Sequence, residues 1–276
     1  MQAVVVGIRF SKVGKIYHFD SAKIPDVAIG DIVVVETSRG WQLGDVVQIL
    51  LDPPPPPDGM WKHVDRKATP RDLVCRQTWQ AKEEEVVESC RQRKEELRLN
   101  GIKIVAAEFS YEGSRLTILF SHETEDKAEL KSLRQDMQKR FAPSQVELRQ
   151  IGPRDVAKIL SGIGACGLEK RCCSQFLTDF SSISIRMAKE QGISLTPTEI
   201  TGMCGRLRCC LVYEYQQYTE ARSHLPKRNK RVMTPLGEGK VVDVHPLSER
   251  VVVEIQDVGY REFPVEELKG LDEPAS

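Results

Sequence analysis

Two short cysteine-rich passages constrain this 276-residue chain more than any other feature of its sequence. Each passes from a Cys-Gly pair through a short basic spacer to Arg-Cys-Cys, and the two spacers differ in length by one residue. Together they hold six of the eight cysteines, and they read Gly-Ala-Cys166-Gly-Leu-Glu-Lys-Arg-Cys172-Cys173 and Gly-Met-Cys204-Gly-Arg-Leu-Arg-Cys209-Cys210. The repetition predicts a duplicated half-site.

The clustered thiols indicate a soft-metal site, because thiolates are the usual protein ligands of zinc and of iron–sulfur clusters. Neighbouring residues point in different directions on a helix or a strand. We therefore expect each Cys-Cys pair to give one ligand to a shared site. With Cys166 and Cys204 this makes four ligands, which suit either a tetrahedral zinc ion or a cubane [4Fe–4S] cluster.

The composition of the passages favours iron–sulfur over zinc. Structural zinc usually has two to four residues between cysteines, and a longer spacer must wrap around a larger object such as a cubane. Glycines beside the first cysteines would let the backbone approach sulfur, and basic residues would offset the cluster's negative charge. These residues are Gly164, Gly167, Gly202, Gly205, Lys170, Arg171, Arg206 and Arg208. We predict the ligand set Cys166, Cys173, Cys204 and Cys209, with Cys172 and Cys210 as the alternative members of the pairs.

Three other states of the cysteines are alternatives to metal binding. Nothing at the N-terminus resembles a secretion signal, so a disulfide framework is not expected. Inert burial is an alternative for the second thiol of each pair and for the isolated Cys75 and Cys90. A redox-active dithiol is the remaining alternative.

The balance of charge limits the partners of the chain. Lysine plus arginine and aspartate plus glutamate each number 40, so no net field draws the chain to nucleic acid or to a membrane. Weak RNA contact would need a local patch such as the basic stretch from Arg222 to Arg231. No apolar run reaches membrane-spanning length, and we expect a cytoplasmic protein without membrane insertion.

The pattern of elements predicts an α+β fold in four regions. Residues 1–57 read as a small β domain ending in a polyproline linker, Pro53 to Pro57. Residues 69–152 read as a long helix, begun by Thr69-Pro70, followed by a ββαβ layer with an antiparallel sheet. Residues 153–226 form the cysteine-rich region, and residues 228–270 read as a small SH3-like β-barrel.

The positions of single elements follow from the same signals. A helix is expected from Glu125 to Arg140, a short one from Ser182 to Gln191, and one continuous helix from Leu207 to Arg222. Tyr213, Tyr215 and Tyr218 on that last helix are expected to cover the cluster or the core, and stacking on unpaired bases is the alternative.

A further set of sequence motifs extends over nearly the whole chain. It includes Val6-Gly7-Ile8-Arg9-Phe10, Gly30-Asp31-Ile32-Val33, Gln150-Ile151-Gly152-Pro153-Arg154-Asp155, Ile185-Arg186-Met187-Ala188-Lys189 and both cysteine passages. In these motifs the chain resembles the bacterial RicT/YaaT family, whose middle part carries the PSP-one C-terminal domain.

The resemblance implies a non-catalytic adaptor. Members of that family join RicA-like and RicF-like helical proteins in a complex with [4Fe–4S] clusters. The complex assists an RNase Y-type endoribonuclease in mRNA maturation and influences sporulation, competence and biofilm formation.

Two other functions remain open. One is a zinc-stabilised nucleic-acid-binding regulator that uses the basic stretch and the terminal barrel. The other is a thiol or iron–sulfur redox protein, although the chain has neither a dinucleotide glycine fingerprint nor a phosphate-binding loop.

Overall fold

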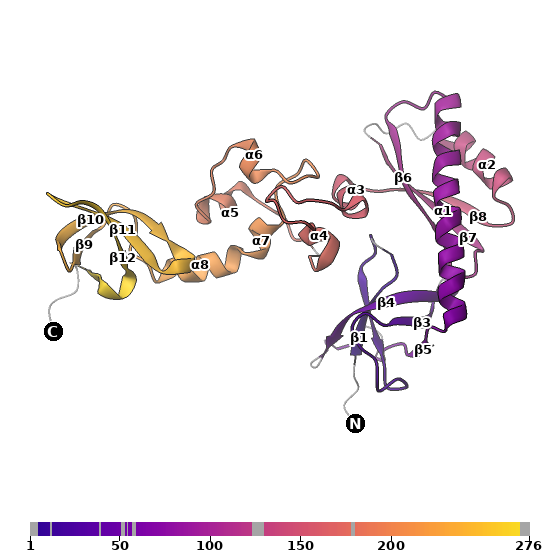
Figure 1. Cartoon of the computed structure of the whole chain (residues 1–276), viewed down its shortest axis with the longest axis horizontal. Coiled ribbons are helices and arrows are strands. Elements are labelled where there is room, and N and C mark those ends of the chain that lie inside the picture. Colours follow the sequence, from indigo (N-terminus) through magenta and orange to yellow (C-terminus); the bar gives the residue numbers. More distant parts are fainter. Residues whose placement is uncertain are drawn as a thin grey trace. The chain divides into compact units, whose positions relative to one another are not determined.

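The computed structural model describes residues 5–11, 13–38, 40–50, 53, 55–56, 59–122, 130–177 and 180–270 (Figure 1). The chain divides into two compact units. The first comprises Met1–Asp179 with Met203–Arg206, and the second comprises Phe180–Gly202 with Leu207–Ser276. Secondary structure is mixed, as the predicted α+β class requires.

The first unit begins with a five-stranded antiparallel sheet of order β2-β1-β4-β3-β5. Alternating valine and isoleucine side chains of these strands, with Phe19 and Ile24, fill its core. β5 follows the proline run and pairs with β3, so the sheet extends beyond residue 57. The strands are β1 Val5–Arg9, β2 Ile16–Asp20, β3 Ile32–Thr37, β4 Gly40–Leu50 and β5 Val64–Lys67.

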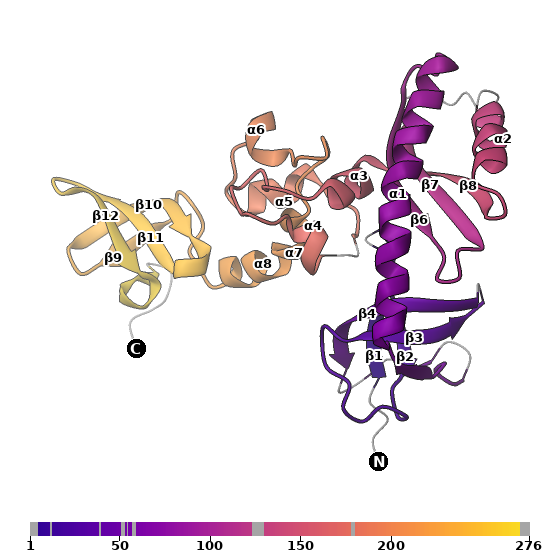
Figure 2. The same ribbon diagram turned by 45° about the vertical axis from the view of Figure 1, so that its right-hand side comes forward.

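The long helix α1 (Pro70–Glu96) begins where the sequence predicts. Thr69 is extended at the N-cap, its hydroxyl accepts a hydrogen bond from the Asp72 amide, and the Asp72 carboxylate accepts one from the Thr69 amide. This capping box, with Pro70 at the first helical position, satisfies donors that the first turn otherwise leaves free. The helix is unbroken and runs from the first sheet to the following α+β layer (Figure 2).

That layer consists of β6 (Ile102–Phe109), β7 (Arg115–His122), α2 (Leu130–Arg140) and β8 (Gln145–Gln150). β6 and β7 are antiparallel, but β8 pairs with β7 in parallel. The expectation of a wholly antiparallel sheet is therefore wrong. α2 carries the chain back along the layer, and such a crossover returns the next strand in the same direction. The predicted start of this helix at Glu125 lies outside the described residues.

Both helices cover one face of the layer. Val86 and Cys90 from α1 and Leu133 and Met137 from α2 share a core with the strands. Two short helices follow, α3 (Pro153–Leu160), which the sequence analysis missed, and α4 (Cys172–Gln175). Gly152 as the N-cap and a proline at the next position are the signals that could have indicated α3.

The second unit opens with four short helices, α5 (Ile185–Glu190), α6 (Pro197–Ile200), α7 (Cys210–Tyr213) and α8 (Tyr215–Ser223). The predicted single helix over residues 207–222 is interrupted at Glu214. In a continuous helix the Leu211 carbonyl would accept from the Tyr215 amide. Here it accepts instead from the Gln191 side chain, with Nε2 and the oxygen 2.6 Å apart.

A five-stranded antiparallel sheet of order β12-β11-β10-β9-β13 completes the second unit. Five of its valines, with Leu225, Ile255 and Phe263, form a separate core. Among the described residues the sheet is open at β12 and β13, so the closed barrel that was expected does not form. The strands are β9 Arg231–Thr234, β10 Gly237–His245, β11 Arg250–Ile255, β12 Gly259–Pro264 and β13 Lys269–Gly270. Within the described part of the chain, no helix combines the length and apolar character that crossing a bilayer requires.

Candidate functional site

The first cysteine passage begins with a tight turn that carries Cys166 at its tip. The Gly164 amide donates to the Leu168 carbonyl at 2.8 Å, and the Gly167 amide donates to the Gly164 carbonyl at 3.0 Å. Gly167 has φ of +86°, which only glycine adopts without strain. A Cβ at position 164 would lie 3.3 Å from the Cys166 sulfur, so glycine keeps this backbone open beside an exposed thiol.

The first Cys-Cys pair opens the helix α4. Its N-cap is Arg171, whose carbonyl accepts from the Ser174 amide at 2.9 Å. The Ser174 hydroxyl in turn donates to the Lys158 carbonyl of α3 at 3.1 Å, which ties the two helices together. Cys172 is half-buried, and Cys173 is only 8% exposed.

The second passage also carries its Cys-Gly pair in a turn, which other bonds close. Thr201 and Leu207 form an antiparallel bridge, and the Arg208 amide donates to the Ile200 carbonyl at 2.9 Å. The bridge closes a turn in which half-buried Cys204 is followed by Gly205, with φ of +73°. Both Cys-Gly pairs thus occupy turns that need a glycine after the cysteine.

The second Cys-Cys pair opens the helix α7, with Cys209 as its N-cap and both thiols half-buried. The Arg208 carbonyl accepts from the Leu211 amide at 3.3 Å, which matches the bond from Ser174 to Arg171 in the first passage. Leu211 is fully buried, and its carbonyl is held by Gln191 of the segment after α5.

The arginine before the first pair is bonded to the backbone ahead of its turn. Arg171 Nε donates to the Ile163 carbonyl at 3.2 Å, and Nη1 donates to the Ala157 carbonyl at 2.6 Å. Ile163 stands three positions before Cys166. The guanidinium therefore fastens the start of the pair to the start of the turn.

The arginine before the second pair makes one equivalent bond and a second bond to a different position. Arg208 Nε donates to the Thr201 carbonyl at 3.4 Å, and Nη2 donates to the Thr198 carbonyl at 2.8 Å. Thr201 stands three positions before Cys204. From the sequence we expected both arginines to compensate the charge of the cluster, and these bonds were not predicted. Their shared position before each Cys-Cys pair indicates that the two arginines are alike, but it does not indicate which carbonyls they bond to.

The donor chemistry of the two passages fits a thiolate-bound metal. None of the eight cysteines, all of which lie in the described ranges, forms a disulfide bond, and the turns expose or half-expose Cys166 and Cys204. Across the described ranges, no three Cys, His, Asp or Glu side chains are gathered closely enough to hold a metal ion. The four-ligand cluster therefore stays a prediction.

The two isolated cysteines differ from each other. Cys90 is fully buried in the core under α1, and desolvation raises the pKa of its thiol to about 11. It is an inert core thiol, as the sequence analysis allowed. Cys75 is exposed on α1.

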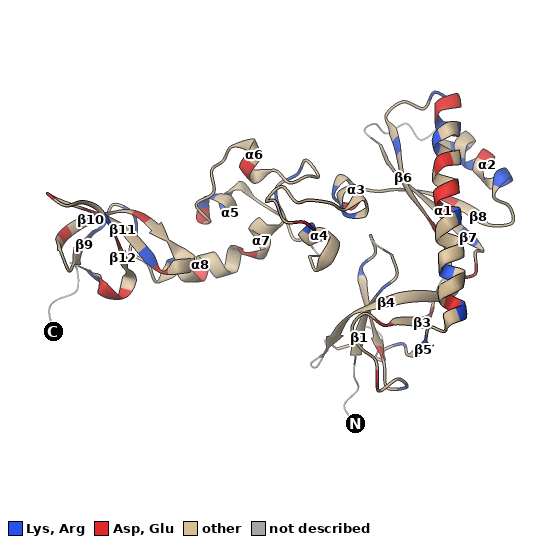
Figure 3. Ribbon diagram, viewed as in Figure 1, with Lys and Arg blue, Asp and Glu red and all other residues tan. Residues whose placement is uncertain are grey.

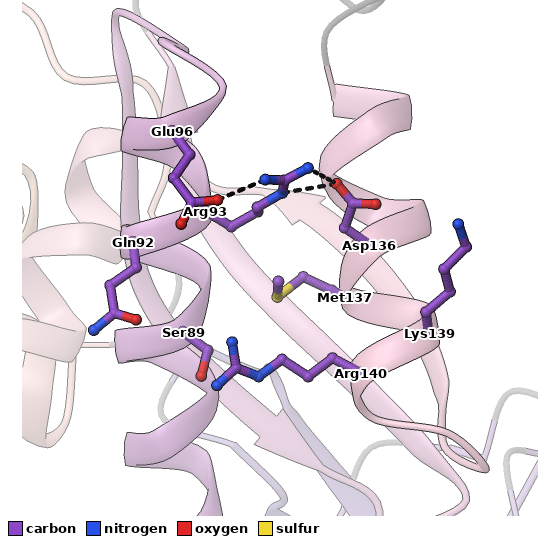
Figure 4. A pocket seen from close by; sticks show the side chains of 8 residues that line it. All are labelled: Ser89, Gln92, Arg93, Glu96, Asp136, Met137, Lys139 and Arg140. Atoms are coloured by element: carbon purple, nitrogen blue, oxygen red, sulfur yellow. Dashed lines mark hydrogen bonds and ion pairs between the residues drawn. The ribbon is translucent and has the colours of Figure 1, made fainter.

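A cavity of about 270 Å³ lies between α1 and α2 (Figure 4). Arg93 of α1 lines it and reaches across to α2, donating to Asp136 at 2.8 Å and to Glu96 of its own helix at 2.5 Å. Arg140 reaches from α2 toward Ser89 on the opposite wall. Because the guanidinium of Arg93 is already bonded to both carboxylates, we interpret this cavity as part of the helix–helix contact.

The basic stretch from Arg222 to Arg231 is largely ion-paired within the second unit. Arg222 pairs with Glu190 at 3.2 Å, Arg231 pairs with Glu238 at 3.2 Å, and Arg228 pairs with Asp243. Each carboxylate neutralises an arginine charge that would otherwise be available to bind the phosphate backbone of a nucleic acid.

Comparisons with known proteins agree with the resemblance noted in the sequence. The model of the PSP1 C-terminal conserved region matches residues 62–151, and that of the PSP1-like protein, third domain, matches residues 182–225. "Stage 0 sporulation protein YaaT" of Bacillus subtilis (strain 168) is 38% identical over 260 residues, which cover 91% of this chain and 90% of that protein. No solved structure matches the chain. Identity at this level over nearly the full length confirms the predicted relationship, and the chain belongs to the YaaT family.

Proposed function

We propose that this chain is a non-catalytic iron–sulfur adaptor subunit of a complex that assists endoribonuclease-dependent mRNA maturation. The observation that carries the proposal is the repeated construction of the two cysteine passages. Each presents a Cys-Gly turn, an arginine bonded to the backbone before that turn, and a Cys-Cys pair at the start of a short helix. A thiol pattern built twice in the same way is typical of a ligand set rather than of scattered core cysteines.

The ligands in this proposal are Cys166, Cys173, Cys204 and Cys209, with Cys172 and Cys210 available as replacements within each pair. Four thiolates suit a [4Fe–4S] cluster. When bound, the cluster would link distant segments of the chain and make partner binding depend on iron. The role of the cysteines is therefore to stabilise a surface, not to perform a reaction.

The proposed partners follow from family membership. A relative named for sporulation supports a regulatory role, and the family resemblance supports RicA-like and RicF-like helical subunits and an RNase Y-type endoribonuclease. On this proposal the effect on sporulation, competence or biofilm formation passes through the processing of transcripts.

The test is the metal content of protein purified without oxygen, with iron, acid-labile sulfide and zinc measured beside the visible absorption spectrum. We expect about four iron and four sulfide per chain. Cys166→Ser and Cys204→Ser should each lose the cluster and, in the same preparation, binding to the two helical subunits. The reason is that a serine hydroxyl is a poor ligand for iron in such clusters.

Cys75→Ser is the matched control, because Cys75 is an exposed cysteine outside both passages. It should leave iron content and partner binding unchanged. Partner binding that survives the loss of iron in Cys166→Ser would overturn the proposed mechanism.

The measurement of metal and sulfide content also distinguishes the proposed adaptor from the main alternative. Colourless protein with one zinc and no sulfide would support the zinc-stabilised nucleic-acid binder, whose RNA affinity should fall steeply with salt. The ion pairs of Arg222, Arg228 and Arg231 with carboxylates favour the adaptor over this alternative.

A further inference from the structure

We infer that Arg171 and Arg208 are positioning residues that set each Cys-Cys pair beside its Cys-Gly turn, and that they act through backbone carbonyls rather than through charge. The inference rests on the proposed cluster and specifies which neighbouring residues retain it. In the sequence these two arginines differ from the other basic residues of the spacers only in standing directly before the Cys-Cys pairs.

The first arginine connects three parts of its passage. Its carbonyl caps α4, while its guanidinium donates to the Ile163 carbonyl before the turn and to the Ala157 carbonyl in α3. Cys172 is the next residue in the chain, and Cys166 follows Ile163 by three positions. The distance between the turn and the pair is thereby fixed by one side chain.

The second arginine does the same with a shorter spacer. Arg208 bonds to the Thr201 and Thr198 carbonyls through its side chain and to the Ile200 carbonyl through its amide. The bonds to Ile163 and Thr201 are equivalent although the spacers differ by one residue. The arginine therefore holds the same two points together in both passages.

Arginine suits this task because its planar guanidinium presents several N–H donors in a fixed fork. A lysine ammonium keeps the positive charge but places its donors on a single nitrogen. It cannot reproduce two separated contacts with the same geometry. Replacing a residue that orients the metal ligands without contacting the metal itself typically lowers metal affinity by 10- to 100-fold.

The other basic residues of the spacers provide an internal comparison. Lys170 and Arg206 are both exposed, and within the described structure neither side chain forms a hydrogen bond or an ion pair. Both are positively charged residues of the same passages, but their side chains do not bond to the backbone. A role through charge and a role through position can therefore be separated with four variants.

The experiment compares Arg171→Lys and Arg208→Lys, which keep charge and remove the fork, with Lys170→Gln and Arg206→Gln, which remove charge alone. Full-length protein is reconstituted with ferrous iron and sulfide without oxygen. Loss of the cluster to an iron chelator is followed by visible absorption. We expect the lysine variants to lose the cluster about 10-fold faster than the unaltered chain and the glutamine variants to behave like it.

The opposite pattern, with rapid loss only in the glutamine variants, would overturn the inference in favour of charge compensation. Equal rates in all five proteins would overturn it as well. Thermal melting of the metal-free proteins serves as the folding control. If the arginines only stabilised the fold, the variants that lose the cluster faster would also have a lower melting temperature. A lysine variant that melts like the unaltered chain but loses iron rapidly supports positioning.

Failure of the proposed function would be visible separately, because the unaltered chain would then bind no iron. In that event hydrogen exchange of the Gly164 amide, which bonds to Leu168, decides the inference in metal-free protein. Faster exchange in Arg171→Lys but not in Lys170→Gln supports it, and equal exchange in both overturns it.

Discussion

Asp72 shows how much a single side chain contributes to the first unit. Its carboxylate is nearly buried and accepts hydrogen bonds from Arg66 at 2.5 and 3.3 Å, from the Tyr111 hydroxyl at 2.5 Å, and from the amide and hydroxyl of Thr69. The hydrogen bonds from Arg66, above all, hold the pKa of Asp72 far below its usual range. One carboxylate thus connects β5, the start of α1 and the turn between β6 and β7.

Asp72→Asn should lower the free energy of unfolding of the first unit at pH 7 by about 2 kcal/mol, because the amide cannot replace a charged acceptor of several donors. The folded pKa lies below the unfolded value of about 3.9. The carboxylate therefore stabilises the fold above about pH 4, and this contribution is lost as the pH falls further. Urea unfolding followed by tryptophan fluorescence at pH 7 and pH 3 measures both effects.

Asp65→Asn is the control, since Asp65 is an exposed neighbour whose carboxylate lies 3.9 Å from Arg66. It should change stability little at either pH. A loss in Asp72→Asn that is as large at pH 3 as at pH 7 would show that the charge of Asp72 is not what stabilises the fold.

At the scale of elements, the sequence predicts those features whose causes lie close together in the chain. Thr69-Pro70 begins α1 because the cap and the proline act on the adjoining turn. The prediction that β8 is antiparallel was wrong, because the direction of this strand depends on how α2 crosses the layer. The break after Tyr213 was missed because it depends on Gln191, which is distant in the sequence.

The candidate site likewise has features that the sequence predicts and features that it does not. The pattern of cysteines identifies the two passages and predicts that they are alike. It does not identify the acceptors of Arg171 and Arg208, because backbone carbonyls have no signature in the sequence. An arginine that bonds to main chain and one that faces solvent look the same in a basic spacer.

The turn between β6 and β7 gives a prediction at this scale. Gly113 has φ of +72°, and a Cβ there would lie 2.2 Å from two carbons of the Trp79 ring of α1. Gly113→Ala should therefore destabilise the first unit by about 3 kcal/mol, combining backbone strain with overpacking. Urea unfolding followed by tryptophan fluorescence measures the loss.

Gly59→Ala isolates the backbone contribution, because Gly59 has φ of +80° and no atom of the described residues lies within 4 Å of the Cβ position. It should cost only about 1 kcal/mol. If both variants lose the same free energy of unfolding, the Trp79 ring can move away from the added methyl group without destabilising the fold.

At the scale of the whole molecule, the chain has separate hydrophobic cores and mixed charge. The core under α1 and the core of the C-terminal sheet share no residues. Acidic and basic side chains alternate in short runs along α1, where Glu83, Glu84, Glu85 and Glu88 are followed by Arg91, Arg93 and Lys94 (Figure 3). The absence of net charge means that stability should depend on these cores more than on long-range repulsion.

Separate cores predict separate unfolding of the two units. Ile118→Ala removes a fully buried side chain from the core under α1, and Ile255→Ala removes one that is 4% exposed from the core of the C-terminal sheet. Each should lower the stability of its own unit by about 3 kcal/mol. In scanning calorimetry of the metal-free chain we expect two transitions, of which each variant lowers one and leaves the other in place. A single transition that both variants lower equally would instead show that the two cores unfold as one cooperative body.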